Sequence, residues 1–156
     1  MAQEEKQLLI KDLCARLPYG VKVKSKNGEV ATLVNPPTAI QDDCWNFKPY
    51  LRPMSSMTEE EAKDMFYYMY QGFKITTCEV ENDRVRFGVV GGKDTCFTHI
   101  LIFFNRIYSL EQFEWLNEHH FDYRGLIERG LALAAPEGMY ERDEYDYAQV
   151  EKPEAH

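Results

Sequence analysis

Apolar and polar positions repeat with two different periods along the chain. In residues 3–17, 59–71 and 110–118 the apolar side chains recur every three to four positions, the spacing of one face of an α-helix. These stretches are followed by a proline, a glycine and a pair of histidines, and both proline and glycine commonly end helices. The pattern therefore predicts three amphipathic helices.

The starts of two of these helices share one pair of residue types. Thr58 is followed three residues later by Glu61, and Ser109 is followed three residues later by Gln112. In such a capping box each side chain can satisfy a backbone N–H group that the first helical turn leaves unpaired. Both helices are therefore predicted to begin directly after the capping residue.

Residues 109–136 are predicted to form a helical corner that closes the core. After the first helix of this corner, Asp122 can cap a second short helix that runs through Ile127. Gly130 is its predicted end, because glycine accepts the left-handed conformation that terminates helices. The corner also holds the densest mixture of aromatic, imidazole and carboxylate groups in the chain, so chemistry should be sought here first.

Strict alternation of apolar and polar residues predicts a first β-hairpin. Its strands are residues 21–24 and 30–34, and they are joined through Asn27-Gly28, which accepts the positive φ angles of a tight turn. Residues 38–57 are predicted to be irregular because two prolines interrupt them, apart from one short strand near residues 44–47.

A second hairpin is predicted from residues 73–80 and 84–90, with Glu81-Asn82-Asp83 as its turn. Residues 95–108 fit either a strand or a helix. A strand through Phe104 is favoured because β-branched and aromatic residues dominate this stretch.

Together these elements predict a single α+β domain over residues 1–136. In this prediction the antiparallel hairpins form one mixed or barrel-like sheet, and the N-terminal, middle and C-terminal helices pack on it. Residues 137–156 hold seven acidic and two basic side chains interleaved with tyrosines, so they are predicted to be a separate acidic tail whose tyrosines could dock.

The composition narrows the classes of function. A formal net charge of −8 repels phosphate backbones, and no basic patch is evident, so a nucleic-acid partner is disfavoured. The longest apolar run, Ile100 to Phe104, is far shorter than the roughly 20 residues that cross a bilayer. With no secretion signal and four widely spaced cysteines, we expect a cytoplasmic protein with reduced thiols, no membrane contact and no bound cofactor.

The candidate catalytic residues are His119, His120 and Asp122, with His99 as a further candidate. Imidazole and carboxylate groups transfer protons and bind metals. Adjacent histidines on a helix point about 100° apart, however, whereas two ligands on one helical face are three or four residues apart. The preferred interpretation is that one histidine caps the helix C-terminus and the other faces solvent.

Cys96 and His99 form a Cys-x2-His pair, and Cys78 could lie on a neighbouring strand. Zinc requires about four convergent ligands, and on a strand Cys96 and His99 would face opposite sides, so no metal site is expected. Residues 88–95 contain three glycines and a lysine but lack the spacing of a phosphate-binding loop.

Three blocks of the sequence carry a resemblance to a known family. They are LLIKDLCARLPYGVKV (residues 8–23), KPYLRPMSSMTEEE (residues 48–61) and EHHFDYRGLIERGLALAAPEGMY (residues 118–140). In these blocks the chain resembles small proteins of unknown function that are encoded in gut-bacterial genomes, often in prophage-like regions. The resemblance implies a link to phages or mobile elements, and it implies no particular activity, cofactor or site residue.

The preferred functional hypothesis is a non-catalytic interaction or accessory module that contacts a protein partner or a second copy of itself. Acidity, the lack of a convergent nucleophile, and more tyrosines near residue 67 than one core face can bury all favour it. One alternative is a hydrolase or transferase centred on His119, His120 and Asp122. Another is an acidic decoy in which residues 137–154 imitate the phosphates of a nucleic acid.

Overall fold

A computed structural model describes residues 1–35, 37, 40, 47–91 and 96–140. In chain order the elements are α1 (Gln3–Arg16), β1 (Lys22–Ser25), β2 (Val30–Thr32), β3 (Phe47–Leu51), α2 (Glu59–Met69), β4 (Phe73–Val80), β5 (Arg84–Gly91), β6 (Cys96–Phe103), α3 (Leu110–Glu118) and β7 (Leu133–Ala134). Helices and strands pack together in one chain, which confirms the α+β class. Within the described ranges, no helix is long and apolar enough to cross a membrane.

The strands divide between two sheets. One has the order β2-β1-β3-β7 and is mixed, because β3 and β7 run parallel while the other pairs are antiparallel; the second has the order β4-β5-β6 and is antiparallel throughout. The two predicted hairpins therefore do not share a sheet, and among the described strands neither sheet closes into a barrel. The physical reason is that α2 separates the hairpins in the chain and buries its apolar face against the second one alone.

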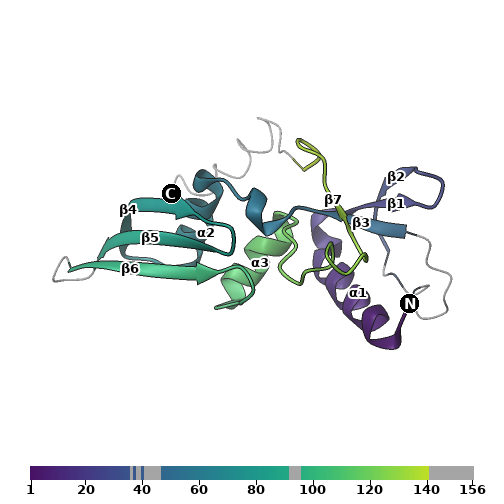
Figure 1. Cartoon of the computed structure of the whole chain (residues 1–156), viewed down its shortest axis with the longest axis horizontal. Coiled ribbons are helices and arrows are strands. Elements are labelled where there is room, and N and C mark those ends of the chain that lie inside the picture. The colour runs from purple at the N-terminus through teal and green to yellow at the C-terminus, as the bar shows by residue number, and fades with distance from the viewer. Residues whose placement is uncertain (36, 38–39, 41–46, 92–95, 141–156) are drawn as a thin grey trace.

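The sheets lie at opposite ends of the molecule, with α3 between them (Figure 1). At one end α2 and α3 cover the inner face of the three-stranded sheet around Phe66, Phe87 and Trp115. At the other end α1 and the chain after α3 pack on the four-stranded sheet around Leu13 and Leu51. Two separate apolar clusters thus form the core, and the segment after α3 runs between them.

Both predicted hairpins and the strand assignment after residue 95 are confirmed. β1 pairs with β2 around Gly28, whose φ of 89° is the left-handed conformation that the Asn-Gly turn was expected to need. β4, β5 and β6 follow one another as an antiparallel meander.

The expectation that prolines keep residues 38–57 irregular is wrong for β3. Pro49 lies within this strand opposite Val23 of β1. Proline is tolerated here because β7 pairs with β3 only at Tyr50 and Leu51. On the β7 side of β3, Pro49 therefore has no neighbouring strand that would need a hydrogen bond from its missing N–H group. Of the strand expected near residues 44–47, only Phe47 lies within the described residues.

The second helix predicted for the corner is absent, and residues 122–130 form a series of turns. Asp122 still caps the segment: its two carboxylate oxygens accept the N–H groups of Leu126, at 2.8 Å, and Ile127, at 3.0 Å. Gly125, at φ 71°, interrupts any right-handed helix three residues after the cap. Leu126 and Leu131 nevertheless reach the core, as their apolar character suggested.

Candidate functional site

His119 ends α3 and is held by the last turn of that helix. Its Nδ1 atom lies 2.8 Å from the Trp115 carbonyl oxygen. Its ring stacks on the Trp115 indole, with the ring centres 3.9 Å apart and the planes 18° from parallel. This arrangement confirms that one histidine of the pair caps the helix C-terminus.

His120 does not face solvent, so that part of the prediction is wrong. Its side chain is only 5 % exposed, and a φ of 62° turns the backbone sharply after α3. Burial lowers the pKa of His120 to about 3, with the positive charges of Arg16, His119 and Arg52 acting in the same direction and a hydrogen bond with the Tyr19 backbone opposing them. The ring is therefore neutral at any physiological pH.

Tyr140, from the start of the predicted tail, closes over His120. The two rings stack with their centres 3.8 Å apart. The Tyr140 hydroxyl donates to the Tyr50 carbonyl oxygen at 2.7 Å and accepts from the Lys22 backbone N–H at 2.8 Å, and burial raises its pKa to about 12. The expectation that a tail tyrosine could dock holds for this residue; residues 141–156 lie outside the described part of the chain.

The candidate catalytic residues of the corner are engaged in structural contacts. Asp122 uses both oxygens to hold two backbone N–H groups, and His119 faces its own helix. His120 stacks beneath Tyr140, and its Nδ1 atom is buried with no hydrogen-bond partner among the described residues. These contacts do not direct the Asp122 carboxylate at either imidazole.

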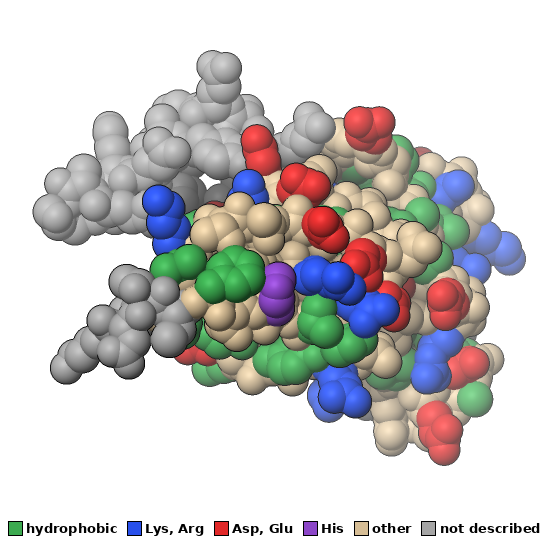
Figure 2. All heavy atoms as spheres, turned by 60° about the vertical axis from the view of Figure 1, so that its left-hand side comes forward, with side chains coloured by type: hydrophobic (Ala, Val, Ile, Leu, Met, Phe, Trp, Pro, Cys, Tyr) green, Lys and Arg blue, Asp and Glu red, His purple; other side chains and the backbone are tan. Residues whose placement is uncertain are grey.

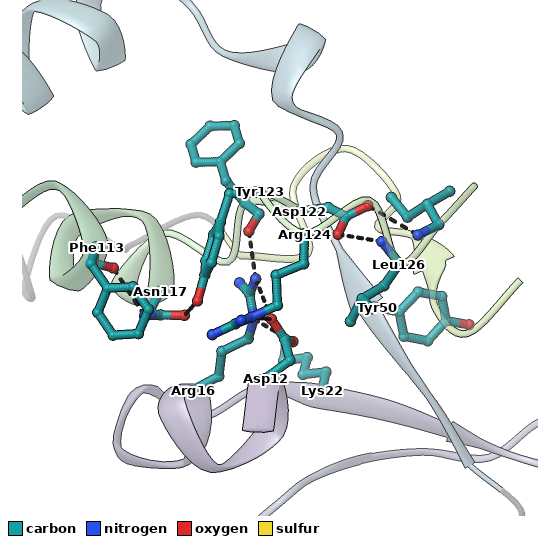
Figure 3. Close-up of polar contacts among 12 residues, drawn as sticks. Asp12, Arg16, Lys22, Tyr50, Phe113, Asn117, Asp122, Tyr123, Arg124 and Leu126 are labelled. Carbon is teal, nitrogen blue, oxygen red and sulfur yellow. Dashed lines mark hydrogen bonds and ion pairs between the residues drawn. The ribbon is translucent and has the colours of Figure 1, made fainter. Parts of the chain in front are cut away.

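A buried ionic network that no sequence pattern predicted lies beside this corner (Figure 3). Asp12 and Arg16 face each other on α1, with 2.8 Å between Arg16 Nε and Asp12 Oδ2 and with neither side chain exposed to solvent. Arg16 also donates to the Phe121 carbonyl oxygen at 2.6 Å, and Arg124 contacts the other Asp12 oxygen at 3.1 Å.

Aromatic and amide groups complete the surroundings of the two arginines. The guanidinium groups of Arg16 and Arg124 lie 5.1 Å and 5.0 Å from the ring centre of Tyr123, which is a cation–π geometry. The Tyr123 hydroxyl donates to Asn117 at 2.8 Å. The network thus joins α1, α3 and the turn segment. The available sequence signal was the spacing of Asp12 and Arg16, four residues apart on the face that carries Leu9 and Leu13.

The second group of candidates, around His99, is split between the two faces of the three-stranded sheet. Cys78 is buried on the side covered by α2, where burial raises the pKa of its thiol to about 11. His99 is exposed on β6, opposite Gly88. Nowhere in the described part of the chain do three His, Cys, Asp or Glu side chains come together as metal ligands. The glycine-rich stretch belongs to β5 as far as Gly91; residues 92–95 lie outside the description.

The side of the β4–β5–β6 sheet away from α2, here called the open face, is a different kind of surface. Val85, Phe87 and Val89 point to the core, so alternation places the intervening residues of β5 and their partners on β6 outward. In Figure 1 α2 lies behind the sheet, and the side toward the viewer carries no described helix. Phe97 is 56 % exposed and Leu101 is 38 % exposed on this face.

Side-chain contacts organise the open face. The rings of Phe97 and His99 meet edge to face with their centres 4.9 Å apart. A methyl group at Gly88 would clash with the Thr77 hydroxyl and would lie 3.2 Å from the Phe97 ring, so this glycine leaves space for both side chains. Figure 2 shows hydrophobic side chains beside a histidine on this end of the molecule, with basic and acidic groups adjoining them.

The two arginines next to this apolar strip are already paired. Arg84 contacts Glu81 at 2.9 Å, and Arg86 contacts the same carboxylate at 3.4 Å. The Arg84 guanidinium also lies 5.3 Å from the ring centre of Phe103. The open face therefore combines exposed apolar side chains with two arginines that are paired with a carboxylate.

Comparisons of the chain with protein-family models, curated proteins and solved structures found no match. The resemblance to prophage-encoded proteins of gut bacteria therefore stays a prediction.

Proposed function

We propose that the protein is a non-catalytic interaction module that binds a protein partner through the open face of the β4–β5–β6 sheet. The observation that carries the proposal is the exposure of Phe97 and Leu101 on the uncovered side of a sheet whose other side packs against the core. Phe97 and Leu101 lie four residues apart on the same side of β6. Exposed apolar side chains gathered on one uncovered surface are typical of protein contacts.

The chemistry of the open face favours a protein over a nucleic acid. Phosphate binding requires arginines and lysines that are free to neutralise charge. Arg84 and Arg86 are instead held by Glu81, and the chain carries a net charge of −8. An apolar patch on the partner, surrounded by polar groups that hydrogen-bond to this arginine–glutamate pair, matches the surface better.

The hydrolase or transferase alternative has little geometric support. General acid–base catalysis needs a titratable group within hydrogen-bond reach of a bound substrate. His120 is buried under Tyr140 and stays neutral, while Asp122 and His119 hold backbone groups. The acidic-decoy alternative concerns residues 137–154, most of which lie outside the described residues, and no observed contact favours it.

Site-specific photo-crosslinking in cells tests the proposal. A photoreactive phenylalanine analogue placed at Phe97 should give a discrete adduct of higher mass, whereas the same analogue at Glu60, exposed on α2, should not. Mass spectrometry of the adduct identifies the partner. An adduct between two copies of the chain would support the same surface with the protein as its own partner.

A second test uses Leu101→Asp, which places a charge within the apolar strip. Because this position is exposed, the substitution should leave folding intact. Its expected effect is loss of the Phe97 adduct, since truncating a central apolar contact typically weakens binding by about 2 kcal/mol. Equal adducts from positions 97 and 60, or an adduct that Leu101→Asp leaves unchanged, would refute the proposal.

A further inference from the structure

A pocket of about 420 Å³ opens at the other end of the molecule, next to the four-stranded sheet. Its apolar walls come from Leu9 of α1, Phe47 of β3, and Leu131 and Leu133 after the turn segment. This volume falls within the range of small-molecule sites, and predominantly apolar walls are typical of them. No residue of the open face takes part, so the pocket is independent of the proposed protein contact.

Three lysines line the same pocket: Lys24, Lys26 and Lys48. All three are exposed, so their aliphatic stems can cover the pocket edge while their ammonium groups stay at its mouth. Within residues 1–35, 47–91 and 96–140, no Asp or Glu side chain forms an ion pair with any of them. The mouth of the pocket therefore carries positive charge that these segments do not balance.

The pairing of β1 with β3 brings two of these positive charges close together. Lys24 and Lys48 are direct cross-strand partners. Like charges at directly opposite positions destabilise a sheet, and most other residue types at either position would avoid the repulsion. An anion at the mouth would remove this cost, so the Lys24–Lys48 pairing supports an anionic ligand independently of the shape of the pocket.

We propose that this pocket binds an amphipathic carboxylate, with the apolar part against Leu9, Leu131 and Leu133 and the carboxylate at the lysines. Burying an acyl chain or aromatic ring supplies the hydrophobic contribution. Charge-assisted hydrogen bonds from ammonium groups to the carboxylate orient the ligand. A ligand without a charged group leaves the lysine repulsion in place, and an anion without an apolar group leaves the pocket empty.

Calorimetric titration of the full chain with decanoate, below its micelle-forming concentration, tests the proposal. Decanol, which has the same chain without the charge, and inorganic phosphate, which has charge without the chain, are the matched probes. Decanoate should bind at least tenfold more tightly than decanol, about the effect of one favourable charged contact, and phosphate should not bind detectably. Added salt should weaken decanoate binding and leave decanol binding unchanged.

Two variants separate the contributions of charge and shape. The double variant Lys24→Gln/Lys48→Gln should bind decanoate roughly tenfold more weakly. Its melting temperature without ligand should equal or exceed that of the parent protein, because the cross-strand repulsion is gone. Leu133→Trp, which fills the apolar part, should abolish binding of decanoate and decanol alike. Lys63→Gln/Lys74→Gln, the same charge change on α2 and β4, should leave binding unchanged.

Equal affinities for decanoate and decanol would overturn the proposal, as would no binding of decanoate at all. Unchanged decanoate affinity in the Lys24→Gln/Lys48→Gln variant would also overturn it, because the lysines would then have no role in recognition. If that variant does not fold, the salt dependence of decanoate binding to the parent protein replaces it as the test, and an affinity that salt leaves unchanged would overturn the proposal.

Discussion

Asp12 supplies the carboxylate that pairs with both arginines of the buried ionic network. Its carboxylate faces Arg16 on one side and Arg124 on the other, and Asp12 and Arg16 are fully buried. A buried ion pair contributes little net stability compared with an apolar pair of the same shape, but losing one partner leaves an uncompensated charge that is costly. The network should therefore be far more sensitive to a single substitution than to its complete replacement.

Replacing Asp12 with Asn should lower the free energy of unfolding by about 3 kcal/mol, since Arg16 then stays buried without a carboxylate. Denaturant unfolding followed by tryptophan fluorescence measures this change. The control is Asp83→Asn, which removes an exposed partner of Arg84 and should cost less than about 1 kcal/mol. Similar losses in the two variants would contradict the role assigned to burial.

His120 should make the stability depend on pH. Its pKa is about 3 in the folded protein against 6.5 as its ordinary value, so the unfolded chain takes up a proton first as the pH falls. The stabilisation is complete above pH 6.5 and is lost progressively toward pH 3, with a loss of about 2 kcal/mol between pH 7 and pH 5.

Unfolding free energies of His120→Asn at pH 7 and pH 5 provide the measurement. Asparagine tolerates the left-handed backbone at this position and does not titrate, so the variant should lose most of this pH dependence. The exposed His99→Asn variant should retain it. A His120→Asn protein with the same pH dependence as the parent would show that another group is responsible.

At the scale of elements, short-range sequence signals determined where helices α2 and α3 begin. Thr58 accepts the Glu61 N–H at 3.1 Å while the Glu61 carboxylate accepts the Thr58 N–H at 3.2 Å, the complete capping box that was predicted. At α3 only half of it forms: Ser109 accepts from Gln112, but the Gln112 side chain accepts from Tyr108 instead. Spacing predicts the start of the helix more reliably than it predicts the second hydrogen bond.

Replacing Thr58 with Ala should destabilise the protein by about 1 kcal/mol, because the first turn of α2 loses its side-chain acceptor. Replacing Thr58 with Ser keeps the hydroxyl group and should retain most of that stability. Thermal unfolding monitored by circular dichroism compares the two variants. Equal melting temperatures for the alanine and serine variants would argue against a stabilising cap.

At the scale of the whole molecule, polar contacts link the two apolar clusters. They share no buried residue, and the Asp12 network together with the Phe121 segment runs between them. Arg52 strengthens this link, because its backbone pairs with His120 and Asp122 while its side chain reaches Glu61 of α2. The prediction of a single domain thus depends on polar contacts at the junction.

If residues 1–136 are one cooperative unit, both clusters should lose protection from hydrogen exchange at the same denaturant concentration. The double variant Asp12→Ala/Arg124→Ala should separate the two transitions, since it removes the ion pairs between α1 and the turn segment. Exchange followed by mass spectrometry reports on peptides from each end. Separate transitions in the parent protein would instead indicate two domains.

The amino-acid sequence alone determined the features that depend on neighbours within a few residues. Helix periodicity, the cap at Thr58, the Asn-Gly turn and the β-branched and aromatic content of β6 are all of this kind, and the structure confirms them. Each arises from backbone sterics or from a hydrogen bond between residues three or four apart, so a short window of sequence contains its whole cause.

Only the tertiary structure decided which distant groups meet. Arg16 and Phe121 are 105 positions apart and Arg124 and Asp12 are 112 apart, and no local pattern records such a pairing. The same holds for the burial of His120 under Tyr140, the place of Pro49 in a strand, and the division of the strands between two sheets. These outcomes depend on packing free energy summed over the whole chain, which separates residues of the same local pattern into core, junction and exposed surface.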